Sequence, residues 1–112
     1  MKRRRKKRPF SPRDHRLYAV FYGMLARCYN PRCPMYRFYG LKGVRMCGLW
    51  ERSFDEFCSW AKKNGYKKGL EIDRINPFGD YVPWNCRWVT QQVGRQNTRK
   101  NYREKMRKMY GY

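Results

Sequence analysis

Positive charge gathers at the two ends of this chain, and it confines a compact fold to the part between them. The 112 residues include 28 lysines and arginines against 8 aspartates and glutamates, which gives a net charge of +20. Residues 1–13 hold 8 basic and no acidic residues, and residues 91–112 hold 7 basic and 1 acidic. Segments this rich in one charge repel themselves and bury little apolar surface. We therefore expect a disordered basic arm over 1–13, a folded domain over 14–101 and a basic helical tail over 102–112.

The composition of the middle predicts a single small core. Hydrophobic residues make up 41% of the chain and aromatic residues 18%, and a chain of this length supports one domain. No apolar run approaches the roughly 18–20 residues that cross a bilayer, and the N-terminus lacks the apolar stretch of a signal peptide. Five cysteines without a CxxC spacing indicate reduced thiols. We expect a soluble cytoplasmic protein with no membrane partner.

Two amphipathic helices are predicted in the first half. The first begins near Ser11-Pro12 and ends before Pro31, because proline disfavours helical geometry in the residue before it. The second begins at Ser53, where Glu56 completes a capping box, and stops at Asn64-Gly65. Apolar residues recur at helical spacing in both. They are Leu17, Phe21, Met24, Leu25 and Cys28 in the first helix and Phe54, Phe57, Cys58 and Ala61 in the second.

The second half predicts a strand, a loop, a strand and a helix, in that order. Residues 70–75 alternate apolar and polar side chains, which is typical of a strand. Residues 76–85 contain two prolines and a glycine and predict a loop. Residues 86–90 then return as a second strand of a hairpin, and residues 91–110 predict a helix. With a further short strand over 43–47, the fold class is α+β.

Arginine recurs at every fourth residue of this last predicted helix. Residues at that spacing share a face, and like charges there destabilise a helix by about 0.2–0.5 kcal/mol per pair. Only Glu104 interrupts the positive series. We interpret the series as a face that follows nucleic-acid phosphates, with a solvated charged surface as the alternative. The arginines are Arg95, Arg99, Arg103 and Arg107.

The segment from Leu70 to Asn101 reads LEIDRINPFGDYVPWNCRWVTQQVGRQNTRKN. It resembles the pattern (L/I)DRI(D/N)..G.Y.P.NCRW.T..(E/Q)..N.R of small phage and mobile-element proteins labelled HNH endonucleases. Two earlier segments, RCYNP at 27–31 and YGLKGVRMCGLWERSFDEF at 39–57, resemble companion elements of the same proteins. The resemblance covers about residues 17–101. It implies a ββα-metal-like C-terminal half, a DNA partner, and a place in the host bacterial cytoplasm or nucleoid if the protein is phage-encoded.

The resemblance also implies candidate catalytic positions. Active HNH nucleases use a metal-binding Asp, an adjacent His as general base, an Asn that orients this His, and a further ligand on the helix. By position these roles fall on Asp73 as metal ligand, Asn85 as orienting residue and Asn97 as second metal ligand. The base position holds Arg74, which stays protonated at working pH and cannot take a proton from water. Arg74 is suited instead to pairing with Asp73 or to binding a phosphate.

Metal chemistry is predicted only for an active nuclease, which would use Mg²⁺ or Mn²⁺. Otherwise no cofactor is expected. A zinc site built from cysteines is the alternative, because thiolates bind Zn²⁺ tightly. Only Cys28 and Cys33 have a suitable spacing, so we expect free, buried cysteines rather than zinc. The other two candidate thiols are Cys47 and Cys86.

Three aromatic residues of the predicted loop leave two interpretations open. Phe78, Tyr81 and Trp84 lie in a stretch flanked by basic residues. Exposed rings beside cations suit stacking on unpaired bases. The same rings are equally suited to filling the core of a small domain.

These patterns together predict a phage-type DNA-binding protein on a nuclease-like frame that lacks its general base. DNA is favoured over RNA as the partner. The alternatives are an active metal-dependent nicking endonuclease, an RNA- or ribonucleoprotein-binding protein, and an inhibitor of an acidic host protein. The residues expected to contact nucleic acid are Arg3, Arg4, Arg5, Lys6, Lys7, Arg74, Arg87, Arg95, Arg99, Lys100, Arg103 and Arg107.

Overall fold

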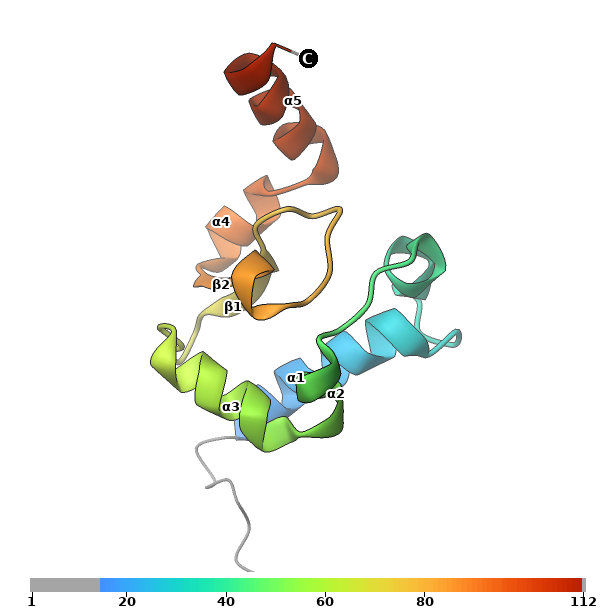
Figure 1. Cartoon of the computed structure of the whole chain (residues 1–112), viewed down its shortest axis with the longest axis vertical. Helices are drawn as coiled ribbons and strands as arrows, with labels where there is room; N and C mark the ends of the chain where they lie inside the picture. Colours follow the sequence, from blue (N-terminus) through green and yellow to red (C-terminus); the bar gives the residue numbers. More distant parts are fainter. Residues whose placement is uncertain (1–14, 112) are drawn as a thin grey trace, which may run out of the picture.

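Helix α1 (His15–Tyr29) opens the part of the chain described by this computed structural model, residues 15–111 (Figure 1). The predicted arm over 1–13 and the predicted helix start at Ser11-Pro12 lie outside these residues. The predicted end of the helix is confirmed, because α1 stops at Tyr29, just before Asn30 and Pro31. Four of the five residues of its predicted apolar stripe are buried, and the fifth, Leu25, is half-buried against the core. Leu17, Phe21, Met24 and Cys28 are buried.

The stretch between the first helix and the hairpin contains more turns than predicted. It forms the 3₁₀ turns η2 (Tyr36–Phe38) and η3 (Gly40–Lys42) and the short helix α2 (Gly48–Arg52). The strand predicted over 43–47 is wrong. Met46 makes only an isolated parallel bridge with Tyr81, because the chain turns into α2 at Gly48 before a ladder can extend.

Helix α3 (Phe54–Lys63) begins at the predicted cap. The Ser53 side chain accepts a hydrogen bond from the Glu56 N–H at 3.3 Å. The Ser53 N–H donates to the Trp50 carbonyl at 3.1 Å, at the end of α2, rather than completing a capping box with the Glu56 side chain. The helix ends where predicted, since Gly65 follows with a φ of +93°, which favours glycine.

The predicted hairpin is confirmed. Strand β1 (Glu71–Arg74) pairs antiparallel with β2 (Cys86–Val89), and the register places Asp73 opposite Arg87. The connecting loop ends in the 3₁₀ turn η4 (Pro83–Asn85). Neighbouring strand residues face opposite sides of a sheet, so Asp73 and Arg74 point in different directions.

The single helix predicted over 91–110 is wrong. Two helices replace it, α4 (Gln91–Gln96) and α5 (Arg99–Tyr110), with a break at Asn97 and Thr98. The break has a local cause, because Thr98 takes an extended conformation and caps α5 by accepting a hydrogen bond from the Asn101 N–H at 3.1 Å.

Replacing Thr98 with alanine is expected to fray α5 without unfolding the domain. The cap contributes about 1 kcal/mol to a helix start, but α5 contributes no buried residue to the core. Amide hydrogen exchange should therefore accelerate over the first turn of α5 while the melting temperature of the domain changes little. Thr98→Ser retains the hydroxyl and should keep wild-type exchange, and faster exchange in that control would argue against the cap.

The core lies between α1, α3 and the hairpin. Phe57 and Trp50 are fully buried, with ring centroids 5.1 Å apart, and Trp60 of α3 packs 5.9 Å from Trp88 of β2. The molecule is thus a small single α+β domain with several helices and a two-stranded antiparallel sheet. Among residues 15–111, no helix is both long and apolar enough to cross a membrane.

Candidate nucleic-acid interface

Asp73 lies at the centre of a hydrogen-bonded site on the face of the hairpin opposite Arg74. The antiparallel register brings Arg87 opposite it, and Arg87 Nε donates to Asp73 Oδ2 at 2.9 Å. The Asp73 side chain is only 11% exposed, whereas that of Arg87 is 42% exposed. The carboxylate is therefore neutralised within the protein, and Arg87 still presents part of its cation to solvent.

Asn97 joins this pair from the break between α4 and α5. Its side-chain nitrogen donates to Asp73 Oδ2 at 3.1 Å, to the Arg74 carbonyl at 2.6 Å and to the Ile75 carbonyl at 3.3 Å. Because all three neighbours are acceptors, the amide must turn its nitrogen toward them. Asp73 and Asn97, the two predicted metal ligands, thus lie together. A hydrogen bond joins them, and they do not present two oxygens to a common metal position.

Asn85 does not join Asp73 and Asn97. Its side-chain nitrogen donates to the carbonyls of Asn76 and Asp80, both at 3.0 Å, and its Oδ1 accepts from the Asn76 N–H at 2.9 Å. These three bonds close the loop between the strands. Asn85 thus holds a loop conformation in this structure, where the resemblance implied that it orients a general base.

Arg74, at the position that the resemblance assigns to the general base, faces away from Asp73. Its Nη1 donates to the Gly79 carbonyl at 2.7 Å, and its guanidinium lies 4.7 Å and 5.2 Å from the ring centroids of Tyr39 and Tyr81. The predicted pairing with Asp73 is wrong, since the partner of that carboxylate is Arg87. The residue is also only 9% exposed, so Arg74 is removed from the cations that a phosphate can reach.

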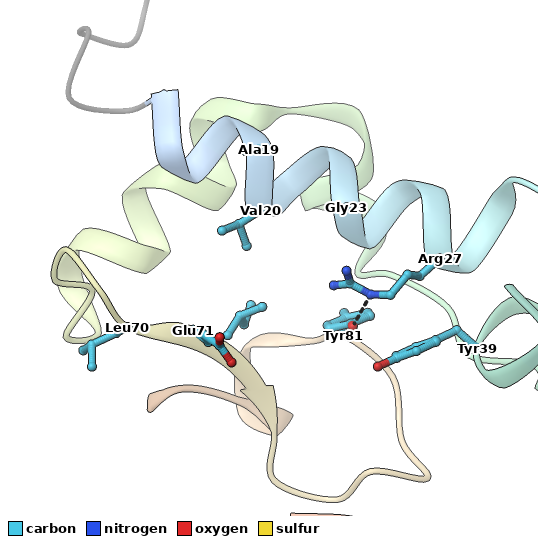
Figure 2. Close-up of a pocket in the computed structure, with 9 residues that line it drawn as sticks. Ala19, Val20, Gly23, Arg27, Tyr39, Leu70, Glu71 and Tyr81 are labelled. Atoms are coloured by element: carbon cyan, nitrogen blue, oxygen red, sulfur yellow. Dashed lines mark hydrogen bonds between the residues drawn. The ribbon is translucent and has the colours of Figure 1, made fainter. Parts of the chain in front are cut away.

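A second guanidinium, from Arg27 of α1, lies beside the same two tyrosine rings, and Figure 2 shows Arg27 with Tyr39 and Tyr81. Arg27 Nε donates to the Tyr81 hydroxyl at 3.2 Å, beside a cavity of about 390 Å³ between α1 and β1. The Tyr39 and Tyr81 rings are nearly parallel, and Arg27 lies within 6 Å of both centroids. Burial raises the pKa of Tyr81, so its hydroxyl remains protonated at neutral pH. Tyr81 is therefore a core residue that fixes the loop against α1.

A cavity suited to anions adjoins the hydrogen-bonded site around Asp73. It has a volume of about 260 Å³ and lies between β2 and the last two helices. Two cations and three side-chain amides line it, and no acidic residue does. The two cations suit a phosphate oxygen, whereas the side-chain nitrogens of Asn97 and Asn101 already donate to acceptors within the protein. The lining residues are Arg87, Val93, Gln96, Asn97, Asn101, Tyr102 and Lys105.

The predicted arginine series is divided between two helices. Arg95 lies on α4, and the other three lie on α5. Arg99 is a docking residue, because its Nη2 donates to the Phe38 carbonyl at 3.0 Å and its Nε to the Pro77 carbonyl at 3.5 Å. Arg103 lies 5.3 Å from the Phe78 ring centroid and is exposed, as is Arg107.

The other predicted contacts are placed only in part. Arg95 and Lys100 are exposed on α4 and α5, whereas the arm residues Arg3, Arg4, Arg5, Lys6 and Lys7 lie outside the described residues. Sequence reasoning missed Lys105, which lines the anion-suited cavity beside Arg87. The spacing of four residues between Asn101 and Lys105 was the one local signal that pointed to it.

The cysteines do not gather around a metal position in the described part of the chain. No group of three or more His, Cys, Asp or Glu residues suited to a metal occurs there, and none of the five cysteines forms a disulfide. Burial raises the pKa of Cys28 to about 11 and that of Cys86 to about 12. Both are therefore protonated thiols at neutral pH.

Comparisons with protein-family models, with curated proteins and with solved structures found no significant match. The function must therefore be argued from the chemistry of the site.

Proposed function

We propose that this protein binds DNA along α5 and the adjoining face of the hairpin, on an HNH-like ββα frame that lacks a general base. The observation that carries the proposal is α5 itself. This helix has six basic residues and one acidic residue, a net charge of +5, and none of its residues is buried. Such a helix gains nothing from core packing and is strained by its own charges. A polyanion removes that repulsion.

The surroundings of α5 support the same partner. The helix extends away from α1 and α3 (Figure 1), and Arg99 docks its first turn on the loop of residues 76–85. Lys105 and Arg87 meet at the anion-suited cavity. Arg103 and Arg107 therefore offer phosphate contacts on one side of α5, and the cavity with Lys105 and Arg87 offers them on the other side. Contacts of this kind position a protein on phosphates without reading the sequence.

The nuclease alternative draws on the contact between Asp73 and Asn97, and we expect a negative result when it is tested. Asp73 already accepts hydrogen bonds from Arg87 and Asn97, and the base position holds an arginine. With Mg²⁺ or Mn²⁺, supercoiled plasmid should stay supercoiled with the wild type, as it should with Asp73→Ala. Nicking by the wild type that disappears in Asp73→Ala would contradict this prediction and establish the enzyme.

A further inference from the structure

Trp84 is the most exposed large hydrophobic side chain in the described residues. It is 80% exposed, compared with 45% for Phe78 in the same loop and 3% for Tyr81. Single exposed hydrophobic residues are ordinary on protein surfaces. Trp84 differs because several hydrogen bonds hold its loop and because a cavity lies beside the indole.

The loop that presents Trp84 is held from both sides. Asn85, the next residue, makes three side-chain hydrogen bonds across the loop. The Arg45 N–H donates to Asp80 Oδ1 at 2.8 Å, and buried Arg74 donates to the Gly79 carbonyl. These bonds fix the backbone that carries the indole before a ligand binds, which reduces the conformational entropy lost when a ligand stacks on it.

The cavity beside the indole has the chemistry of a base-recognition site. It has a volume of about 330 Å³ and is lined by Asn76, Gly79, Asp80, Val82, Trp84 and Asn85. Asp80 brings a carboxylate to a strongly basic protein, and within residues 15–111 no hydrogen bond involves its Oδ2. A carboxylate repels phosphates, whereas it accepts hydrogen bonds from base amino groups such as N4 of cytosine.

The cavity also lies near the proposed path of the nucleic acid. Phe78 belongs to the same loop as Trp84, and the guanidinium groups of Arg99 and Arg103 lie 5.4 Å and 5.3 Å from its ring centroid. A strand held by α5 therefore passes beside the loop. Stacking on an aromatic ring tolerates any base, because every base has a π-face, so the carboxylate supplies the discrimination.

We propose that Trp84 and its adjoining cavity bind one unpaired nucleobase that carries an exocyclic amino group. The base stacks on the indole and donates its amino hydrogen to Asp80. This inference rests on the proposed function, because α5 holds the strand that carries the base.

The test compares short duplexes that are fully paired or carry one unpaired cytosine or thymine, by fluorescence anisotropy at fixed salt. We expect the unpaired cytosine to strengthen binding about tenfold over the paired duplex, within the range measured for stacking of one base. Thymine should gain less, because it lacks an exocyclic amino group and its one ring donor, N3–H, lies between two carbonyl oxygens that repel the Asp80 carboxylate. Trp84→Ala should abolish the gain without changing affinity for the paired duplex, and Asp80→Asn should reduce the preference for cytosine over thymine.

Leu49→Ala is the matched control, since Leu49 is 51% exposed on α2 at a distance in sequence from the loop. It should retain the cytosine preference. Equal wild-type affinity for paired and unpaired duplexes, or an equal loss on both with Trp84→Ala, would overturn the inference while paired-duplex binding still supports the proposed function. A protein that binds no duplex would contradict both the proposed function and the inference about Trp84. The same gain with an unpaired cytosine in RNA assigns the site to either nucleic acid, and a gain in DNA alone restricts it to DNA.

Discussion

Replacing Arg103 and Arg107 together with glutamine is expected to weaken binding to paired DNA by about 60-fold at about 0.1 M salt. Both side chains are exposed on α5, and neither supports the core. Each phosphate contact releases about 0.9 counterion, so each lost contact costs roughly eightfold at that salt concentration. The slope of log K against log salt should become shallower by about 1.8. Titrations by fluorescence anisotropy across a salt series measure both quantities.

The control for that variant removes the same amount of charge elsewhere. Arg32 and Arg52 are exposed outside α5. The double variant Arg32→Gln with Arg52→Gln therefore has the same net charge as the double variant in α5. This control should keep the wild-type slope. Equal losses in the two double variants would show that total charge, rather than α5, determines binding. Structured RNA that displaces the duplex at equal concentration would favour the RNA interpretation instead.

Asn97→Ala is expected to lower the free energy of unfolding by about 2–3 kcal/mol. Its amide nitrogen is shared by Asp73 and two backbone carbonyls, and removing a donor from partly buried acceptors costs about 1–3 kcal/mol, more where one is charged. For a domain of this size, each kcal/mol shifts the melting temperature by about 4–8 °C. Thermal unfolding followed by circular dichroism should therefore show a fall of about 10–20 °C.

Gln96→Ala provides the comparison, because Gln96 is exposed and precedes Asn97 in the chain. Its melting temperature should stay near that of the wild type. If the melting temperature of Asn97→Ala is also near that of the wild type, the hydrogen bonds of Asn97 contribute little to stability. The position of Asp73 must then depend on Arg87 alone.

Local sequence signals predicted the elements whose cause is local. The alternation over 70–75 identified β1, and the Ser53 cap placed the start of α3. The break at Asn97 and Thr98 escaped prediction because neither glycine nor proline marks it. Thr98 caps α5 and so separates it from α4. The side-chain amide of Asn97 donates to residues more than twenty positions away in the sequence.

The roles within the candidate site depended on tertiary contacts that no local pattern reports. Arg74 is buried because Tyr39, far away in sequence, provides a ring for its guanidinium. Tyr81 became a core residue while Trp84, three positions later, remained exposed. The family resemblance implied Asp73 and Asn97 as ligands of one metal ion, whereas in the structure Asn97 donates a hydrogen bond to Asp73. Arg87, predicted to contact phosphates, pairs with the Asp73 carboxylate.

The buried Arg74 has a structural role that a substitution toward nuclease chemistry would disturb. Replacing it with histidine would introduce a base but withdraw a guanidinium from the Tyr39 and Tyr81 rings and a donor from the Gly79 carbonyl. Freeing Asp73 for a metal would require the loss of Arg87 as well, which leaves a largely buried carboxylate without its cation. Each step alone is therefore expected to destabilise the domain, so under the proposed function any route to cleavage passes through variants less stable than the present protein.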